Sequence, residues 1–105
     1  MSVSDMINKL PEALNADAAA DTNATIQFNT TEPKHIRIAD GACTVSDGTA
    51  DSPDVTLTMD DDDLADMLTG ELNGMTAFMT GKLQLDGDMM LAQKIVTLFD
   101  PAKLK

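Results

Sequence analysis

The feature that most constrains the fold is a change in the spacing of apolar residues near residue 60. Between residues 26 and 59, apolar side chains alternate with polar ones in four short runs, each with one apolar face. This period of two is typical of half-buried antiparallel strands. From residue 60 onward, apolar residues recur at i, i+3 and i+4, which indicates helices. A sheet and helices must then share one core, so we predict an α+β domain.

The four alternating runs predict four consecutive strands. The apolar positions that share a face in each run are Ile26 and Phe28; Ile36 and Ile38; Cys43 and Val45; and Val55, Leu57 and Met59. Asp40 and Gly41 separate the second run from the third, and this pair can form a tight hairpin turn. A longer connection, residues 47–53, precedes the fourth run. We therefore expect an antiparallel meander.

The segment before the strands predicts one helix. Residues 4–14 carry apolar side chains on a single helical face, and Ser4 is a suitable N-cap. Pro11 lies inside this pattern and is expected to kink or end the helix near Leu10, because proline lacks the N–H that the helix requires. Residues 15–23 are expected to form either a continuation of the helix or a loop.

Three helices and a fifth strand are predicted after residue 59. The Asp run at residues 60–63 suits the N-cap and first turn of a helix that Gly70 ends. Residues 74–80 have helical spacing, residues 82–86 alternate as a strand does, and residues 88–99 form a last helix capped by Asp88. The predicted domain therefore has a five-stranded, mostly antiparallel sheet covered on one face by helices.

Length and charge limit the function. The 105 residues suit a single domain over residues 1–105. Lys and Arg number 7 against 18 Asp and Glu, a net charge of -11. Phosphate backbones and anionic membranes repel such a chain, so we expect neither nucleic-acid binding nor stable membrane anchoring. The N-terminus lacks the pattern of a signal peptide, which predicts a cytoplasmic protein.

The sequence offers little for catalysis. It has one His and one Cys, and His35 has the phase of the polar strand face while Cys43 has that of the apolar face. The Asp run at residues 60–63 lacks the alternating ligands and glycine turn of a calcium loop, so helix capping is the better interpretation. We expect no enzyme activity, no metal site and no cofactor.

Methionine is unusually frequent and unevenly placed. Six of the eight Met residues fall within residues 59–90, on the predicted helices and the adjoining edge of the sheet. One interpretation is a Met-rich core. The other is an apolar cavity whose wall adapts to a flexible ligand, because the unbranched thioether repacks easily.

Residues 55–99 resemble the sterol carrier protein type 2 family. The similarity is carried by Val55 to Met59, Leu64 to Leu72, Ala77 to Leu83, Leu85, Gly87 to Met89, Leu91 to Ile95, and Leu98 with Phe99. The most specific part is Phe78-Met79-Thr80-Gly81-Lys82-Leu83. The resemblance implies a hydrophobic tunnel between sheet and helices that binds sterols, fatty acids, acyl-CoAs or other apolar lipids, without catalytic residues. It also implies that Gly81 and Gly87 are turn glycines, at sites where helix and strand meet tightly.

The resemblance also implies which residues contact the lipid. By position, they are Leu64, Met67, Leu68, Met75, Phe78, Met79, Leu83, Leu85, Met89, Met90, Leu91, Ile95 and Phe99. Two residues depart from the family pattern. Met90 replaces a residue that is often small, which predicts a narrower tunnel or a movable plug, and Gln93 places a polar group in the last helix.

Three functions fit this sequence. The first is non-catalytic binding and transfer of an apolar lipid. The second is an accessory role in which the chain presents a hydrophobic intermediate, such as a quinone precursor, to other enzymes. The third is a structural dimerisation module with a closed groove, and a homodimer stays open in each case. A dry void of roughly 300 Å³ would cost about 7 kcal/mol, so we expect the tunnel to hold lipid or to collapse.

Overall fold

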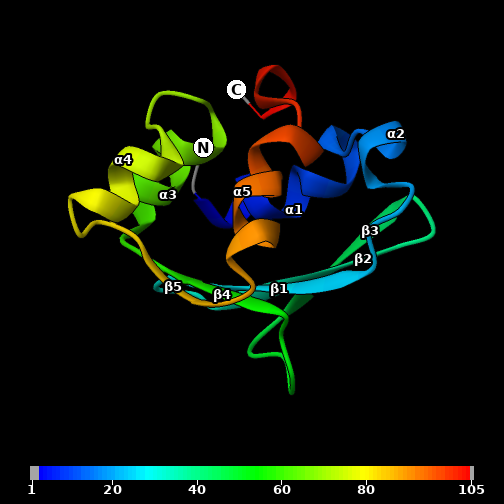
Figure 1. Cartoon of the computed structure of the whole chain (residues 1–105), viewed down its shortest axis with the longest axis horizontal. Helices are drawn as coiled ribbons and strands as arrows, with labels where there is room; N and C mark the ends of the chain where they lie inside the picture. Colours follow the sequence, from blue (N-terminus) through cyan, green and yellow to red (C-terminus); the bar gives the residue numbers. More distant parts are fainter. Residues whose placement is uncertain (1–2, 105) are drawn as a thin grey trace.

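The computed structural model describes residues 3–104, apart from the side chains of residues 95–97 and 101. The elements follow one another as α1 (Val3–Ala13), α2 (Ala16–Ala19), β1 (Ala24–Asn29), β2 (Lys34–Ala39), β3 (Ala42–Asp47), β4 (Val55–Thr58), α3 (Asp61–Leu68), α4 (Gly74–Met79), β5 (Gln84–Gly87), α5 (Met89–Leu98) and the short 3₁₀ helix η1 (Pro101–Lys103). Figure 1 shows the helices together on one face of the sheet. The predicted α+β class is confirmed.

The sheet has the strand order β3-β2-β1-β4-β5. Three of its four pairings are antiparallel, and β4 runs parallel to β1 with Val55 opposite Ile26. The mostly antiparallel sheet is as predicted, but the four-strand meander is wrong, since the fourth strand returns to the far side of the first. Asp54 holds this return in place. Its backbone N–H donates to Thr25 O at 2.8 Å, and its Oδ2 accepts from Thr25 N at 2.7 Å.

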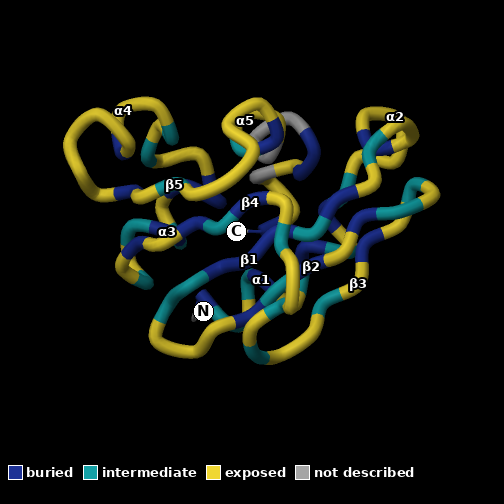
Figure 2. Tube along the Cα trace, turned by 60° about the horizontal axis from the view of Figure 1, so that its bottom comes forward, coloured by how far each residue is buried: buried dark blue, intermediate teal, exposed yellow. Residues whose placement is uncertain are grey.

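The core lies between the sheet and the helices. The inward side chains of β1 and β2 are fully buried, as are Ile7 and Leu10 on α1, which packs against β3 and α3. Figure 2 shows the contrast between the buried strands and the mostly exposed segment around α4. The sequence-predicted apolar face of each strand is therefore the face that the helices cover.

The first helix continues through Pro11, so the predicted end near Leu10 is wrong. Pro11 has no N–H, so α1 lacks the one backbone bond that this residue would donate to the carbonyl of Ile7, but the helix still continues for two residues to Ala13. Beyond it, the Ala13 carbonyl accepts from the backbone N–H of Asp100 at 2.9 Å. Residues 15–23 contain the separate helix α2, and Asn15 caps it by accepting from the backbone N–H of Asp17 at 3.1 Å.

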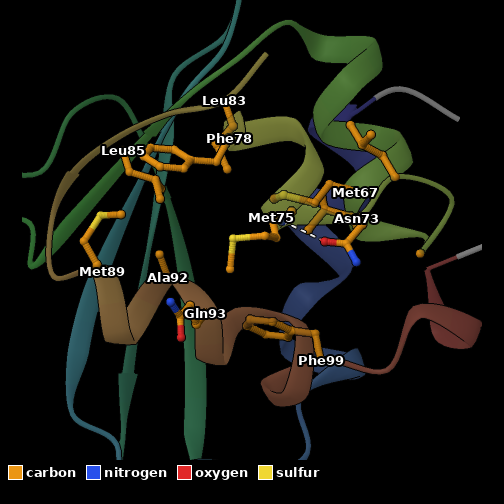
Figure 3. A pocket seen from close by; sticks show the side chains of 14 residues that line it. Met67, Asn73, Met75, Phe78, Leu83, Leu85, Met89, Ala92, Gln93 and Phe99 are labelled. Carbon is orange, nitrogen blue, oxygen red and sulfur yellow. Dashed lines mark hydrogen bonds between the residues drawn. The ribbon is translucent and has the colours of Figure 1, made fainter. Parts of the chain in front are cut away.

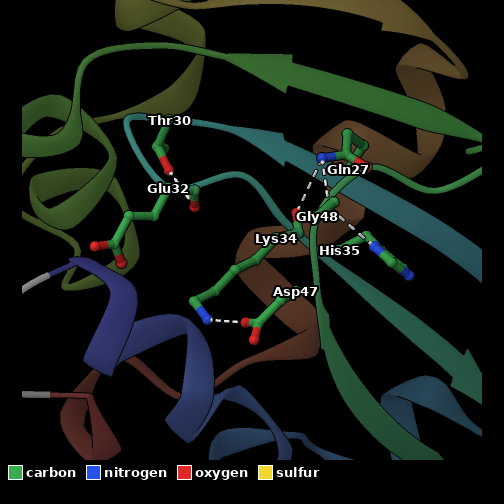
Figure 4. A network of polar contacts seen from close by, with 7 residues as sticks. All are labelled: Gln27, Thr30, Glu32, Lys34, His35, Asp47 and Gly48. Carbon is green, nitrogen blue, oxygen red and sulfur yellow. Dashed lines mark hydrogen bonds and ion pairs between the residues drawn. The ribbon is translucent and has the colours of Figure 1, made fainter.

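A polar network on the outer face fixes the long connection before β4 (Figure 4). Gln27 is only 1% exposed, and its Nε2 donates to Gly48 O and to the carbonyl of Lys34, both at 3.3 Å. The ring nitrogen Nδ1 of His35 lies 3.1 Å from the same Gly48 oxygen. The contacts of Gln27 and His35 to Gly48 pin the connection that carries the chain back to β1. On the opposite, helix-covered face, Lys34 forms an ion pair with Asp47, which lowers the pKa of that carboxyl group.

The last strand and helix differ slightly from their predicted limits. Strand β5 begins two residues later than predicted, and α5 ends at Leu98, after which Phe99 is extended and pairs with Leu14. The predicted cap of this helix is confirmed, because Asp88 Oδ1 accepts from the backbone N–H groups of Met90 at 3.0 Å and Leu91 at 3.1 Å. Phe99 thereby lies at the junction between the last helix and the end of α1.

Candidate functional site

A cavity of about 630 Å³ lies between α3, α4, β5 and α5 (Figure 3). Its wall consists of Met67, Leu68, Gly70, Leu72, Asn73, Gly74, Met75, Phe78, Leu83, Leu85, Met89, Ala92, Gln93 and Phe99. Most of these side chains are aliphatic, aromatic or thioether groups. The cavity therefore fits an apolar molecule of considerable size.

The loop between α3 and α4 forms one side of the wall. Helix α3 ends at Leu68 with Thr69 as its C-cap, and Gly70 follows with a φ of 85° that reverses the chain, as the sequence predicts. The backbone N–H groups of Glu71 and Leu72 then donate to the carbonyl of Asp66 at 2.8 and 3.0 Å. This closed turn brings Leu72 and Asn73 to the cavity. Asn73 caps the next helix, since its Oδ1 accepts from Met75 N at 2.8 Å.

Helix α5 forms the opposite side, and a tight contact at its start sets its position. A Cβ atom on Gly87 would lie 2.3 Å from the carbonyl oxygen of Asp54, closer than any side chain can approach. The next residue, Asp88, donates its backbone N–H to the same oxygen at 2.8 Å. The helix thus begins directly against the start of β4, which places Met89 and Gln93 on the cavity side.

The cavity has a buried base and an open mouth. Met67 and Leu83 at the base are 7% and 5% exposed, whereas Met75, Phe78 and Met89 are 55%, 42% and 41% exposed. Large apolar side chains are seldom exposed together unless they serve contact with a ligand or partner. The cavity in this structure is therefore open on one side, whereas the resemblance implies an enclosed tunnel.

The described residues of the wall carry no charged side chain, and their polar side chains are the carboxamides of Asn73 and Gln93. The other groups considered for catalysis lie elsewhere. Cys43 is buried under the helices, which raises the pKa of its thiol to about 11, while His35 faces the outer side of the sheet. Neither residue lines the cavity, and the wall residues that the structure describes offer apolar contact and hydrogen bonds but no titratable group.

The structure brings eight of the thirteen sequence-predicted residues to the cavity. These are Met67, Leu68, Met75, Phe78, Leu83, Leu85, Met89 and Phe99. Leu64 and Leu91 are buried outside the wall, and the Ile95 side chain lies outside the described residues. Met79 and Met90 are 78% and 72% exposed and are not part of the wall, so Met90 neither narrows nor plugs this cavity.

Six wall residues were not among the predicted contacts. They are Gly70, Leu72, Asn73, Gly74, Ala92 and Gln93. An Asn followed by a helical run is a recognisable N-cap, so the position of Asn73 at the start of a helix could have been found. Gln93 stood out in the sequence as a polar group on the last helix. The loop positions follow no period, and the sequence therefore gives no indication of their role.

Within residues 3–104, none of the helices has the length and apolar character needed to cross a bilayer. The described His, Cys, Asp and Glu side chains do not gather in groups of three that could hold a metal ion. What the fold and the cavity define is a small α+β domain with one open apolar hollow, the architecture of a carrier of apolar molecules.

Residues 5–100 match the family model described as the SCP-2 sterol transfer family, and the chain belongs to this family. It is 46% identical over 52 residues to peroxisomal multifunctional enzyme A of Dictyostelium discoideum, a match that covers 50% of this chain and 12% of that protein. The chain spans about a tenth of the length of such curated relatives. In that relative, a domain of this kind is thus one part of a larger enzyme.

Solved structures share the fold over nearly the whole chain. Sterol carrier protein 2 from Yarrowia lipolytica, in its apo form, has a TM-score of 0.74 at 26% identity, covering 94% of this chain and 88% of that one. The palmitated SCP2L2 from Aedes aegypti has a TM-score of 0.68 at 26% identity, covering 92% and 93%. The resemblance stated from the sequence is therefore confirmed.

Proposed function

We propose that this chain binds an apolar lipid in the cavity between α3, α4, β5 and α5 and carries it without chemical change. The observation that supports this most is the cavity itself, which measures about 630 Å³ and has no charged side chain among the 14 described residues of its wall. Apolar surface that is removed from water when the ligand binds contributes about 25 cal/mol per Å² to the free energy of binding. A lipid that fills such a cavity is therefore held mainly by the hydrophobic effect.

The free energy of the empty state supports the same proposal. A closed, dry void of about 630 Å³ at about 24 cal/mol per Å³ would cost about 15 kcal/mol. That equals the upper end of the stability of a whole domain, about 5–15 kcal/mol. The open mouth lets water enter instead, so the helices need not collapse onto the sheet. Water against an apolar wall is displaced favourably by an apolar ligand.

The proposed contacts divide into a base and a mouth. Met67, Leu83 and Phe99 are buried and would meet the apolar body of the lipid. Met75 and Met89 are partly exposed, and their flexible thioethers would close over ligands of different shape. The palmitated form of the Aedes aegypti relative supports a ligand with an acyl chain. Residence in the cytoplasm and formation of a homodimer stay predictions.

Native mass spectrometry and a thermal shift assay test this proposal. A ligand at about 100 times its Kd adds about 2.7 kcal/mol, which raises the thermal midpoint of a domain of this size by about 10–20 °C. Ala92→Trp places a large side chain in the cavity wall and should abolish the shift. Ala42→Trp, on an exposed position of β3, should not. No shift with any sterol, fatty alcohol, fatty acid or quinone would overturn the proposed function.

A further inference from the structure

The mouth of the cavity carries exposed thioether groups. Of the methionines that the structure describes, Met75 on α4 and Met89 on α5 are the two that both line the cavity and face solvent. We propose that these two thioethers form a reversible oxidation site, at which a peroxide converts methionine to its sulfoxide and thereby weakens lipid binding. This inference rests on the proposed function and adds a modification that controls it.

Met75 and Met89 lie where both an oxidant and a bound lipid can reach them. Their side chains are 55% and 41% exposed, so a small solute in water can contact them. Figure 3 shows the two residues on separate elements, with the Met75 side chain reaching from α4 toward the middle of the hollow. A lipid that fills the hollow would cover both side chains. Attack by an oxidant and occupancy by a lipid therefore compete at the same groups.

The third methionine of the wall, Met67, is protected. It is only 7% exposed, and a Cβ atom on Gly74 would lie 3.5 Å from its Sδ atom. The Met67 sulfur thus lies against the start of α4, and a peroxide reaches it only when α4 separates from α3. The structure therefore divides the wall thioethers into an accessible pair at the mouth and a covered one at the base.

The chemical step is a two-electron oxidation of sulfur. The sulfur lone pair attacks one oxygen of hydrogen peroxide, and the S–O bond forms as the O–O bond breaks. The leaving hydroxide takes the proton of the transferred oxygen and departs as water, so the peroxide is reduced as the thioether is oxidised. Methionine sulfoxide reductases reverse the step for both sulfoxide epimers, with a dithiol that is oxidised to a disulfide.

A sulfoxide changes what the mouth of the cavity can hold. The thioether is apolar and flexible, whereas the sulfoxide is polar. Beneath a bound lipid its oxygen loses water, and an acyl chain offers no hydrogen-bond donor in exchange. Burial of an unpaired polar group should weaken lipid binding about tenfold. If the oxidised side chain turns outward instead, the lipid loses its contact with that side chain, so the affinity falls in either case.

Two methionines outside the wall provide an internal comparison. Met79 at the end of α4 and Met90 in the first turn of α5 are 78% and 72% exposed and do not line the cavity. Their exposure predicts that they oxidise at least as fast as the two mouth residues. Their sulfoxides stay in water whether or not a lipid is bound, so they should leave lipid affinity unchanged.

Peroxide treatment, followed by peptide mass spectrometry and calorimetric titration with dodecan-1-ol, tests this inference. Oxidation of the unmodified chain should weaken binding about tenfold, and reduction by the two sulfoxide reductases with dithiothreitol should restore it. Dodecan-1-ol at about ten times its Kd leaves the cavity empty about a tenth of the time. It should therefore slow oxidation of Met75 and Met89 about tenfold and leave Met79 and Met90 unprotected.

Two double variants assign the effect to the mouth residues. The wall variant combines Met75→Leu with Met89→Leu, which keeps apolar side chains of similar volume but forms no sulfoxide there. Its affinity for dodecan-1-ol should survive peroxide. The matched control combines Met79→Leu with Met90→Leu, which removes the same number of exposed thioethers outside the wall. It should lose affinity on oxidation as the unmodified chain does.

The outcomes separate this inference from the proposed function. Unchanged affinity of the unmodified chain after both mouth sulfoxides have formed overturns the inference, while lipid binding itself stands. A loss of affinity in the peroxide-treated wall variant also overturns it, because the effect then arises elsewhere. If the untreated chain binds neither dodecan-1-ol nor a sterol, fatty acid or quinone, the proposed function and the inference fail together.

Discussion

Replacing Gly87 with alanine tests the contact that sets the position of α5. Gly87 lies opposite Val55 in the β4–β5 pairing and has a φ of 108°. A Cβ atom there would lie 2.3 Å from Asp54 O and 3.0 Å from Val55 Cα, both backbone atoms. Asp54 cannot easily retreat, because two hydrogen bonds tie it to Thr25. We therefore expect both conformational strain and steric overlap.

The two effects can be estimated separately. A non-glycine residue held in a sparsely populated backbone region costs about 1–3 kcal/mol. Forcing an extra methyl group into a filled space costs about another 1–3 kcal/mol. Gly87→Ala should thus lower the free energy of unfolding by about 2–6 kcal/mol. For a domain of this size, the thermal midpoint falls by about 10 °C or more.

Gly81→Ala separates strain from overlap. Gly81 has a φ of 80°, but a Cβ atom there would have no neighbour within 4 Å, so alanine should cost only the strain, about 1–3 kcal/mol. Urea unfolding followed by circular dichroism measures both variants against the unmodified chain. If Gly87→Ala destabilises the chain no more than Gly81→Ala does, the close approach of α5 to the start of β4 is not as described.

Three further predictions concern the cap, the outer network and the thiol. Asp88→Ala should lower the free energy of unfolding, measured in urea, by about 1 kcal/mol, because it removes the cap of α5. Asp60→Ala should lower it by less, because Asp60 makes no side-chain cap bond on α3. Equal losses in the two variants would contradict this prediction. Gln27→Leu should cost about 1–3 kcal/mol by removing the hydrogen bonds of Gln27 to the carbonyls of Lys34 and Gly48 and to the backbone N–H of Ala50, and a neutral result would refute the network's role. Burial raises the pKa of the Cys43 thiol from 9.0 to about 11, so the reactive thiolate is scarcer in the folded protein. At pH 8, Cys43 should therefore react with iodoacetamide about 100-fold more slowly in folded than in urea-unfolded protein. Comparable rates in the two states would contradict this prediction.

The sequence predicts the local structure well because local structure follows local pattern. Alternation identifies which side of each strand is buried, and the cap at Asp88 and the stop at Gly70 follow from residue chemistry. Alternation does not say which strands pair. The parallel pairing of β4 with β1 depends instead on the connection pinned by Gln27, whose contacts are distant in sequence. Gly81 was expected at a tight junction, but open space surrounds it, and only its backbone angle requires glycine.

The cavity is less predictable than the fold. Helical spacing identifies an inward face, but that face can meet either the core or an open hollow. Leu64 and Leu91 meet the core, whereas Met67 on the same helix as Leu64 reaches the cavity. Where a helix is short and lies at the surface, some apolar side chains stay exposed, as Met79 does. Whether an apolar helical side chain meets the core, lines the cavity or stays exposed depends on how the helices pack in three dimensions, and the spacing of residues along the sequence does not contain that information.

Methyl-labelled methionine gives the most direct test of lipid binding in the cavity. Met67, Met75 and Met89 line it, while Met6 and Met59 lie elsewhere in the described structure. Titration with dodecan-1-ol, followed by NMR, should shift the methyl signals of the three wall residues and leave the other two unchanged. The exposed methionines outside the wall serve as surface controls. Shifts confined to those surface methyl groups, with the buried wall residue Met67 unmoved, would contradict binding in the cavity.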